Sequence, residues 1–286
     1  MMIDFLEPRR FLSVSFDSKS GTLTVVGTDH VDSIVFSEEI LHPSKAQVLR
    51  LHFNGQTSDY ADGTVKLIRV NAMAGADTVI LGSISVPSLI QGGEGNDSLS
   101  GGDASDTMDG GGGNDYVYGR KGTDIISGGI GYDTIGGGPG TDRLIPLSDS
   151  NGDDTVSGGK GMDTVDYTSS PFKISAFIGG SVSQHAESDK LGHDIEVIIG
   201  SVFNDSITNS TSRPMKLVGG AGDDTISGGS GNDTIDGGTG HDSMKGNGGK
   251  DVFVSDDGEA DTINGGSGAD SILSSDSGLD VVTNVP

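Results

Sequence analysis

Aspartate recurs at every ninth residue of the glycine-rich stretch from Gly92 to Ile145. A glycine stands two residues before each aspartate, except where Ala104 takes its place. The carboxylates are ionised at neutral pH, and paired glycines let the backbone turn through positive φ and bring its carbonyl oxygens together. Such oxygens are hard ligands that suit Ca²⁺, which takes about 6–8 of them. The spacing therefore predicts a series of calcium-binding turns at Asp97, Asp106, Asp115, Asp124, Asp133 and Asp142.

The same pattern continues after this stretch and returns in a second run from Gly219 onwards. Single turn aspartates are common, but they would not recur at nine-residue spacing beside the same glycines. We predict further aspartate ligands at Asp154, Asp163, Asp224, Asp233, Asp242, Asp251, Asp261 and Asp270. The glycines of these turns complete the predicted metal sites, and they are Gly93, Gly95, Gly111, Gly113, Gly129, Gly131, Gly220, Gly222, Gly229, Gly231, Gly238 and Gly240.

The residues that position these turns form a short apolar pattern. The segment after each aspartate is too short for a helix but long enough for a short strand, whose middle residue points the opposite way from its neighbours. That middle residue is apolar, and we expect it to point inward at Leu99, Met108, Val117, Ile126, Ile135, Leu144, Val156, Val165, Ile226, Ile235, Met244 and Phe253. A fixed period this short indicates a solenoid.

The repeat GGxGxDxUx, in which U is a large apolar residue, resembles the RTX (haemolysin-type) calcium-binding repeat. The longer pattern D-x-(L/I)-x4-G-x-D-x-(L/I)-x-G-G-x3-D of that family occurs without a mismatch at Asp124–Asp142 and at Asp224–Asp242. The resemblance implies an all-β fold, a parallel β-roll (β-solenoid) of glycine-rich nonapeptides in which two repeats make one coil. It also implies that each Ca²⁺ lies between turns two repeats apart on the same edge.

The chain divides by pattern into five parts. Residues 1–15 resemble a LEPR-type sorting motif, or else form a solvated basic segment; residues 16–91 are a β-rich leader with degenerate repeats; residues 92–166 are the first β-roll block; residues 167–199 are a β excursion or hairpin; and residues 200–286 are the second block with a degenerate C-terminal cap. Strands are predicted in the leader at 22–26, 33–36, 47–53 and 64–70. A separate small β domain is the alternative for the leader.

Several positions depart from the repeat. Asp77 has the expected neighbours, whereas Asp32 lacks the glycine two residues before it. Met215 stands where an aspartate is expected, so this coil is predicted to lack a metal on that edge. Asp205 resumes the pattern weakly, and Asp280 keeps few of the glycines. We interpret His185, His193 and His241 as surface residues, and Tyr116 and Tyr118 as outward-facing residues that could form a small adhesive patch.

Composition excludes several classes of protein. The chain has 42 acidic and 17 basic residues, a net charge of −25, which argues against nucleic-acid binding. It has no cysteine, and no apolar run approaches the ~20 residues of a membrane span. The HExxH motif of zinc peptidases and the GxSxG motif of lipases do not occur. We therefore expect a protein without catalytic activity of its own.

Calcium is expected to drive folding. Two inward residues per coil are too few to offset the entropy of ordering two nonapeptides, and the crowded carboxylates repel one another without metal. We expect several ions, on the order of six to ten, if each needs about six oxygens from two turns. Sites of about 10⁻⁴–10⁻³ M affinity would fill only outside the cell, so we expect an extracellular or cell-surface location.

The predicted role is structural or adhesive, with a surface polysaccharide or another surface protein as partner. The alternative is a non-catalytic accessory module that acts with a polysaccharide-modifying enzyme. Ice binding would need a regular outward row of threonines, and the outward positions Ser98, Thr107, Tyr116, Ile125, Thr134 and Arg143 do not form one.

Overall fold

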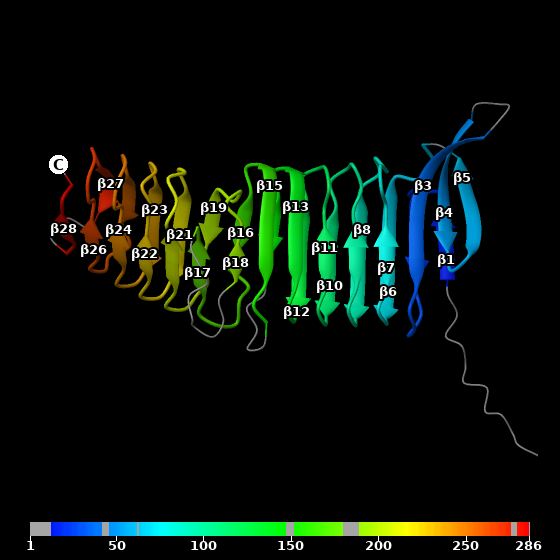
Figure 1. Cartoon of the computed structure of the whole chain (residues 1–286), viewed down its shortest axis with the longest axis horizontal. Coiled ribbons are helices and arrows are strands. Elements are labelled where there is room, and N and C mark those ends of the chain that lie inside the picture. The colour runs from blue at the N-terminus through cyan, green and yellow to red at the C-terminus, as the bar shows by residue number, and fades with distance from the viewer. Residues whose placement is uncertain are drawn as a thin grey trace, which may run out of the picture.

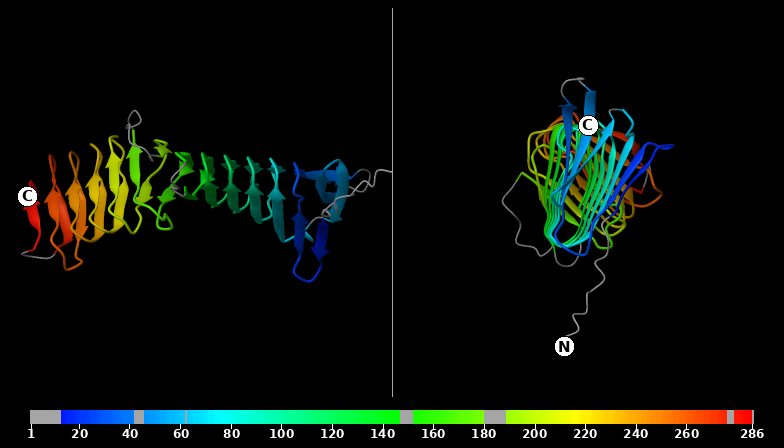
Figure 2. Two further views of the ribbon diagram at one scale, coloured as in Figure 1. Left: turned by 90° about the horizontal axis from the view of Figure 1, so that it is seen from below. Right: turned by 90° about the vertical axis from the view of Figure 1, so that its right-hand side faces the viewer.

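The computed structural model describes residues 13–41, 46–61, 63–146, 152–179, 189–275 and 279–285. Every regular element in these ranges is a β-strand, and the strands stack along an elongated roll (Figure 1). Viewed along the long axis, the coils wind around a narrow interior (Figure 2). The predicted parallel β-roll is thus confirmed, with about 10 turns. Within the described ranges no helix is long and apolar enough to cross a membrane.

Two sheets make up the roll. Sheet A contains, in spatial order, β1 (Ser13–Asp17), β2 (Thr22–Val26), β6 (Leu67–Ala74), β8 (Ser88–Glu94), β10 (Thr107–Gly112), β12 (Ile125–Ile130), β14 (Arg143–Ile145), β16 (Thr164–Asp166), β19 (Val197–Ile199), β21 (Lys216–Ala221), β23 (Thr234–Thr239), β25 (Val252–Ser255) and β27 (Ser271–Ser275). Sheet B contains, from the opposite end, β28 (Val281–Thr283), β26 (Thr262–Asn264), β24 (Ser243–Lys245), β22 (Thr225–Ser227), β20 (Ser206–Asn209), β17 (Ser175–Ile178), β18 (Lys190–Leu191), β15 (Thr155–Gly161), β13 (Thr134–Gly140), β11 (Tyr116–Tyr118), β9 (Ser98–Ser100), β7 (Thr78–Ile80), β3 (Ser33–Leu41), β4 (Ala46–Phe53) and β5 (Gln56–Ala61).

Equivalent residues of successive coils stack in register. Met108 of β10 pairs with Ile126 of β12 in sheet A, and Val117 of β11 pairs with Ile135 of β13 in sheet B. All four side chains are at most 1% exposed. The predicted inward residues from Leu99 to Phe253 are all buried and belong to one core cluster. In these glycine-rich coils the core is therefore little more than one row of apolar side chains per sheet.

The N-terminal end is closed by antiparallel strands. β1 pairs antiparallel with β2, and β3, β4 and β5 form an antiparallel meander at the end of sheet B. The rings of Phe16 and Tyr60, one from each sheet, lie 5.7 Å apart. The strand predicted at 64–70 is shifted, because the backbone N–H of Thr64 donates to the Ala61 carbonyl in a turn and β6 begins only at Leu67.

The hairpin interpretation of residues 167–199 is wrong. β17 pairs in parallel with both β18 and β20, and β19 joins sheet A between β16 and β21. The strands are also out of sequence order, because β18 lies between β15 and β17. The segment belongs to the roll. It adds two strands, β18 and β17, to sheet B between β15 and β20, whereas it adds only β19 to sheet A, between β16 and β21.

Candidate metal sites

The aspartates form two ladders, one along each edge of the roll. The backbone N–H of Asp97 donates to Oδ1 of Asp115 at 2.8 Å, and the N–H of Asp115 donates to Oδ1 of Asp133 at 2.7 Å. This first edge contains Asp32, Asp77, Asp97, Asp115, Asp133, Asp154 and Asp189, and later Asp205, Asp224, Asp242, Asp261 and Asp280. The second edge contains Asp106, Asp124, Asp142, Asp163 and Glu196, and later Asp233, Asp251 and Asp270.

The other carboxylate oxygen, Oδ2, is left without a partner in most of these residues. It is buried and makes no hydrogen bond in Asp77, Asp97, Asp115, Asp124, Asp133, Asp142, Asp154, Asp163, Asp224, Asp242, Asp251, Asp261 and Asp270. A buried, unpaired carboxylate oxygen is costly, and native proteins rarely keep one without a ligand. Repetition of the same orphaned atom along both edges points to a ligand that the sequence pattern anticipates.

Backbone carbonyls crowd around the orphaned oxygens. A Cβ added at Gly110 would lie 2.5 Å from Oδ2 of Asp115 and 2.3 Å from the carbonyl oxygen of Gly128. At the next residue, Gly111 has a φ of +109°, and a Cβ there would lie 2.1 Å from the carbonyl oxygen of Gly93. Only glycine allows oxygens of adjacent coils to approach this closely.

The donor set fits Ca²⁺. Each turn offers one carboxylate oxygen and several carbonyl oxygens, which a hard cation prefers over a transition metal. The described residues contain no group of three or more His, Cys, Asp or Glu side chains that could hold a metal ion by themselves. The two observations agree, because successive turns contribute one carboxylate each and backbone supplies the remaining ligands.

Burial also makes the carboxylates hard to ionise without a cation. Burial, together with smaller contributions from the neighbouring Asp133 and Asp97 carboxylates, raises the pKa of Asp115 to about 7. Burial likewise raises the pKa of Asp124 and Asp224 to about 7, and that of Asp142 and Asp242 to about 6. A bound divalent cation would reverse this preference.

Comparison with known families gives the same assignment. A family model described as RTX calcium-binding nonapeptide repeat (4 copies) matches residues 89–117, 118–150, 146–168, 216–244, 227–260 and 245–276. This is an RTX-repeat protein. The matched segments cover both orphan-rich parts of the ladders and leave residues 169–215 unmatched. No curated protein matches the sequence.

The structure separates two kinds of turn among the predicted RTX aspartates. Twelve of the fourteen carry an orphaned Oδ2. In the other two, which we call closed turns, a backbone N–H of the same turn donates to Oδ2. The donors are Gly102 N–H to Asp106 and Gly229 N–H to Asp233, both at 2.7 Å. Ten of the twelve predicted glycines have positive φ, and the exceptions, Gly229 and Gly231, belong to the closed turn of Asp233.

Six of the ladder members are absent from the predicted set. Asp32 and Asp77 lie in the N-terminal leader, and Asp77 carries an orphaned oxygen like the predicted ligands. Asp189 and Glu196 lie in the segment without glycine repeats, and Asp205 and Asp280 in weak repeats. Their common signal is an acidic residue two positions before an apolar one, as in Asp189–Leu191 and Glu196–Ile198. Met215 occupies the register position of an aspartate, since its N–H donates to Oδ1 of Asp233.

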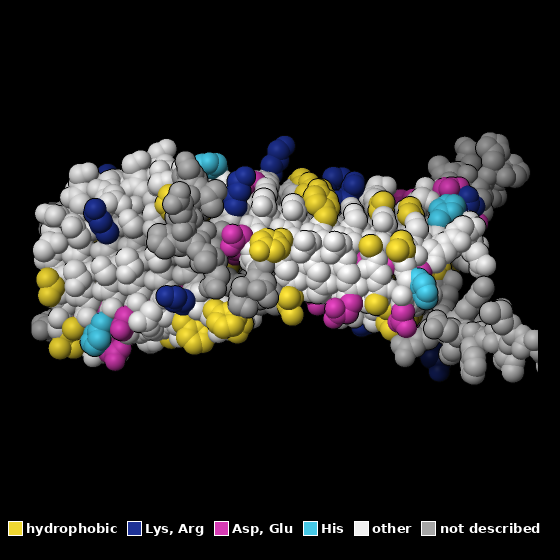
Figure 3. All heavy atoms as spheres, turned by 60° about the horizontal axis from the view of Figure 1, so that its bottom comes forward, with side chains coloured by type: hydrophobic (Ala, Val, Ile, Leu, Met, Phe, Trp, Pro, Cys, Tyr) yellow, Lys and Arg dark blue, Asp and Glu magenta, His cyan; other side chains and the backbone are white. Residues whose placement is uncertain are grey.

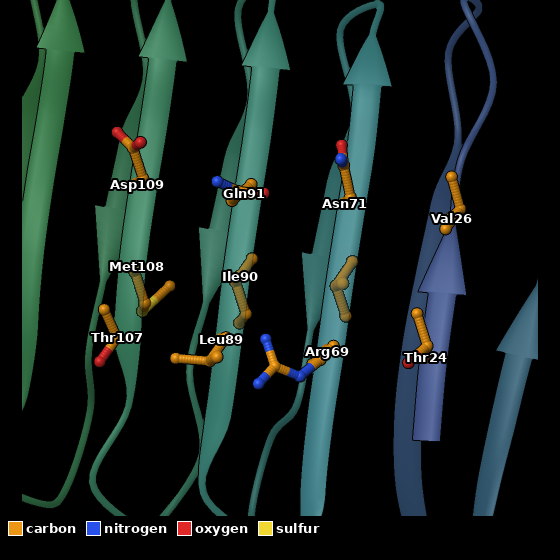
Figure 4. Close-up of a pocket in the computed structure, with 11 residues that line it drawn as sticks. Thr24, Val26, Arg69, Asn71, Leu89, Ile90, Gln91, Thr107, Met108 and Asp109 are labelled. Atoms are coloured by element: carbon orange, nitrogen blue, oxygen red, sulfur yellow. The ribbon is translucent and has the colours of Figure 1, made fainter. Parts of the chain in front are cut away.

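A second candidate site is a groove of about 450 Å³ on the outer face of sheet A, across β2, β6, β8 and β10 (Figure 4). Asn71, Gln91 and Asp109 form one cross-strand row, and Arg69 and Leu89 lie in the row beside it. No ion pair of Arg69 occurs among the described residues. The groove therefore presents a guanidinium, two amides and a carboxylate at the roughly 4.8 Å strand spacing.

Elsewhere the apolar surface is scattered. Hydrophobic side chains form separate groups on the face shown in Figure 3. Tyr116 and Tyr118 face outward as predicted, on either side of the buried Val117. Tyr116 is 53% exposed, whereas the Tyr118 ring lies over Gly136. An adhesive role of this pair stays a prediction.

Proposed function

We propose that the protein is a structural, calcium-loaded β-roll that folds when it binds Ca²⁺. The observation that carries the proposal is the set of thirteen ladder aspartates in the described residues whose buried Oδ2 atom has no hydrogen-bond partner. Ten of these oxygens lie beside a glycine at which an added Cβ would come within 2.6 Å of them, and a cation that prefers oxygen ligands accounts for such buried, crowded carboxylates.

The chain's own residues would hold the metal in a repeated way. Oδ2 of Asp115 and the carbonyl of Gly128 lie beside Gly110, and the carbonyl of Gly93 lies beside the next residue, Gly111; such oxygens of neighbouring coils would supply the ligands. Oδ1 of the same aspartate stays bonded to the backbone N–H of the preceding coil and fixes the carboxylate in place. Bound Ca²⁺ would supply the positive charge that the crowded carboxylates lack.

Location follows from the affinity such sites have. Extracellular calcium modules work at about 10⁻⁴–10⁻³ M Ca²⁺, so the glycine-rich blocks of the roll would stay unfolded in the cytosol and fold outside. Apart from calcium, a net charge of −25 and a thin core leave little to stabilise the metal-free chain. These properties support a secreted or cell-surface protein.

Calcium-dependent folding is tested by circular dichroism of the full chain titrated with Ca²⁺ against chelator, together with isothermal titration calorimetry. We expect a β signal that appears with calcium, and more bound ions than the six to ten estimated from sequence, up to thirteen. Asp124→Asn should remove one ion. Asp109→Asn, which makes the same charge change on the outer face of sheet A, should remove none. An equal β signal in chelator would sink the proposal.

The groove on sheet A favours a polysaccharide as the adhesive partner. Donors and acceptors at regular spacing, beside the apolar Leu89, suit a linear chain with many hydroxyl groups. The same surface would serve an accessory module of a polysaccharide-modifying enzyme, a role that requires a separate catalytic protein to co-purify with this chain.

Affinity electrophoresis of the calcium-loaded chain tests this partner, with a neutral glucan and a polyuronate in separate gels. We expect retardation in at least one gel, and its loss in the double variant Arg69→Ala, Gln91→Ala. Lys216→Ala removes a cation from the outer face of sheet A outside the groove and should leave retardation unchanged. Migration unaffected by either polysaccharide would exclude the groove as their binding site.

A further inference from the structure

We propose that residues 166–179 and 189–216 form a metal-free joint, which divides the roll into two calcium cassettes that load independently. The N-terminal cassette carries the orphaned carboxylates from Asp77 to Asp163, and the C-terminal cassette those from Asp224 to Asp270. This inference rests on the proposed calcium binding. In the joint, hydroxyl, backbone N–H and guanidinium groups of the protein bond to the carboxylate oxygens that would bind calcium elsewhere in the roll.

On the first edge, a tyrosine replaces the metal. The hydroxyl of Tyr167 donates to Oδ2 of Asp189 at 2.7 Å, and Oδ1 of Asp189 accepts the backbone N–H of Asp154 as in every other rung. Tyr167 is 1% exposed, so its ring fills the interior beside the carboxylate. Burial raises the pKa of Tyr167 well above its usual value, so the hydroxyl stays protonated and donates its hydrogen bond to Asp189.

The next rungs of the first edge are closed in another way. Ile174 stands in register where an aspartate would be, and its N–H donates to Oδ1 of Asp205 at 2.8 Å. The second oxygen of Asp205 accepts the backbone N–H of Ser201, and the Ser201 hydroxyl bonds Oδ1 at 2.9 Å. Both Asp205 oxygens therefore have protein partners.

The second edge is interrupted at the same level. Glu196 accepts the N–H of Asp163 through Oε2 at 2.9 Å, and its Oε1 forms an ion pair with Arg213. Met215 follows and brings no carboxylate. The next aspartate, Asp233, is closed by the Gly229 N–H. Among the described residues between Asp163 and Asp224, no acidic side chain has an orphaned buried oxygen.

The strand order marks the same place. β17, β18 and β19 lie midway along the roll between two regular stacks (Figure 1). β18 precedes β17 in space although it follows β17 in sequence. In a repeat protein each coil contacts only its neighbours, so the cooperativity of folding depends on the interface between adjacent coils. It is interrupted where that interface changes. Calcium on one side of the joint shares no ladder carboxylate with calcium on the other.

The test is hydrogen exchange of the full chain across a calcium titration, read by mass spectrometry in peptides from 92–146 and from 219–272. In the variant Asp242→Asn, the calcium midpoint of the C-terminal peptides should rise by roughly tenfold, which corresponds to about 1.4 kcal/mol. The midpoint of the N-terminal peptides should stay within about twofold of the wild type. Asp236→Asn, on the outer face of the same cassette, is the matched control and should shift neither midpoint.

Each outcome decides the proposal. A parallel rise in both sets of peptides overturns the joint. If Asp242→Asn abolishes folding of the C-terminal cassette altogether, a normal N-terminal midpoint supports the joint and a lost one overturns it. A wild-type chain that binds no calcium refutes the proposed function, whereas one that binds calcium but couples the two cassettes refutes only the joint.

Tyr167→Phe provides an independent measurement at saturating calcium. Because the tyrosine position holds no ion, the number of bound ions measured by calorimetry should not fall below that of the wild type. An ion gained would show that the hydroxyl occupies a ligand position at Asp189, whereas an ion lost would show that Tyr167 belongs to a metal site and would overturn the inference.

Discussion

The N-terminal part of the roll and the glycine-rich block that follows it share one coil geometry but differ in their interiors. Residues 22–91 contribute sixteen buried hydrophobic residues among those described, including the aromatic Phe36 and Phe53. Residues 92–166 are slightly longer and contribute eight. Among the described ladder residues, the N-terminal part has one orphaned Oδ2, that of Asp77, whereas the block has seven.

The difference shows that apolar burial and metal ligation substitute for each other along one scaffold. Where β3, β4 and β6 fill the interior with branched and aromatic side chains, the turns need no glycine pairs. Where the interior narrows to one residue per strand, the stabilising interactions move to the edges. The N-terminal part is therefore expected to stay folded without calcium, whereas the glycine-rich block is expected to unfold.

The largest expected effect is on the block when calcium is removed. In excess chelator, peptides from 92–146 should lose hydrogen-exchange protection entirely, because the carboxylates are left unpaired and mutually repelling. Peptides from 46–61 and 67–81 should keep measurable protection from their apolar core. Full protection of 92–146 in chelator would show that both regions stay folded without calcium, and it would contradict the proposed difference between them.

The second effect concerns the glycines that let coils of the block approach. Gly111→Ala places a Cβ 2.1 Å from the Gly93 carbonyl oxygen at a φ of +109°. Strain and overpacking together should destabilise the calcium-loaded roll by about 2–6 kcal/mol. Gly112→Ala is the matched control, since the nearest atom there is a flexible Glu94 oxygen at 3.1 Å. It should cost less than about 1 kcal/mol in urea unfolding at saturating calcium; equal losses would contradict the carbonyl-crowding account.

The third effect separates the two interiors by their core residues. Ile68 in β6 and Ile126 in β12 are both fully buried. Ile68→Ala should lower the unfolding free energy of the N-terminal part by about 2–5 kcal/mol whether or not calcium is present. Ile126→Ala should act through the calcium midpoint of the block, because the block has no metal-free fold to destabilise. An effect of Ile126→Ala that is the same in chelator would argue against that distinction.

The sequence was enough for the parts governed by the period. The aspartate spacing placed the turns, and alternation placed inward residues such as Met108 and Val117, because a strand side chain every second residue faces the core. The two sheets and the parallel pairing follow from the repeat family. The turn aspartates were found wherever glycines accompanied them.

The remainder depends on contacts between residues far apart in sequence. The spacing that identified Asp106 and Asp233 carries no information on whether a turn N–H reaches Oδ2. Asp189 became recognisable as a ladder member only once β18 was seen between β15 and β17, because that order reverses the sequence. The Tyr167–Asp189 bond spans 22 residues with no repeat to announce it.

The smallest effect is a pH dependence of calcium binding that is stronger in the glycine-rich block than in the N-terminal part. Burial raises the pKa of Asp115 and Asp124 to about 7. A carboxylate whose folded-state pKa is raised stabilises the metal-free fold at pH below its unfolded value near 3.8, and this contribution is lost as pH rises through 6–7. Calcium requires the deprotonated form, so its affinity should rise over the same window.

We expect the calcium midpoint of peptides from 92–146 to be roughly tenfold lower at pH 7.5 than at pH 5.5, with little change in the protection of 67–74. A midpoint independent of pH would mean that these carboxylates are ionised before calcium arrives, and that repulsion among them, rather than protonation, opposes folding.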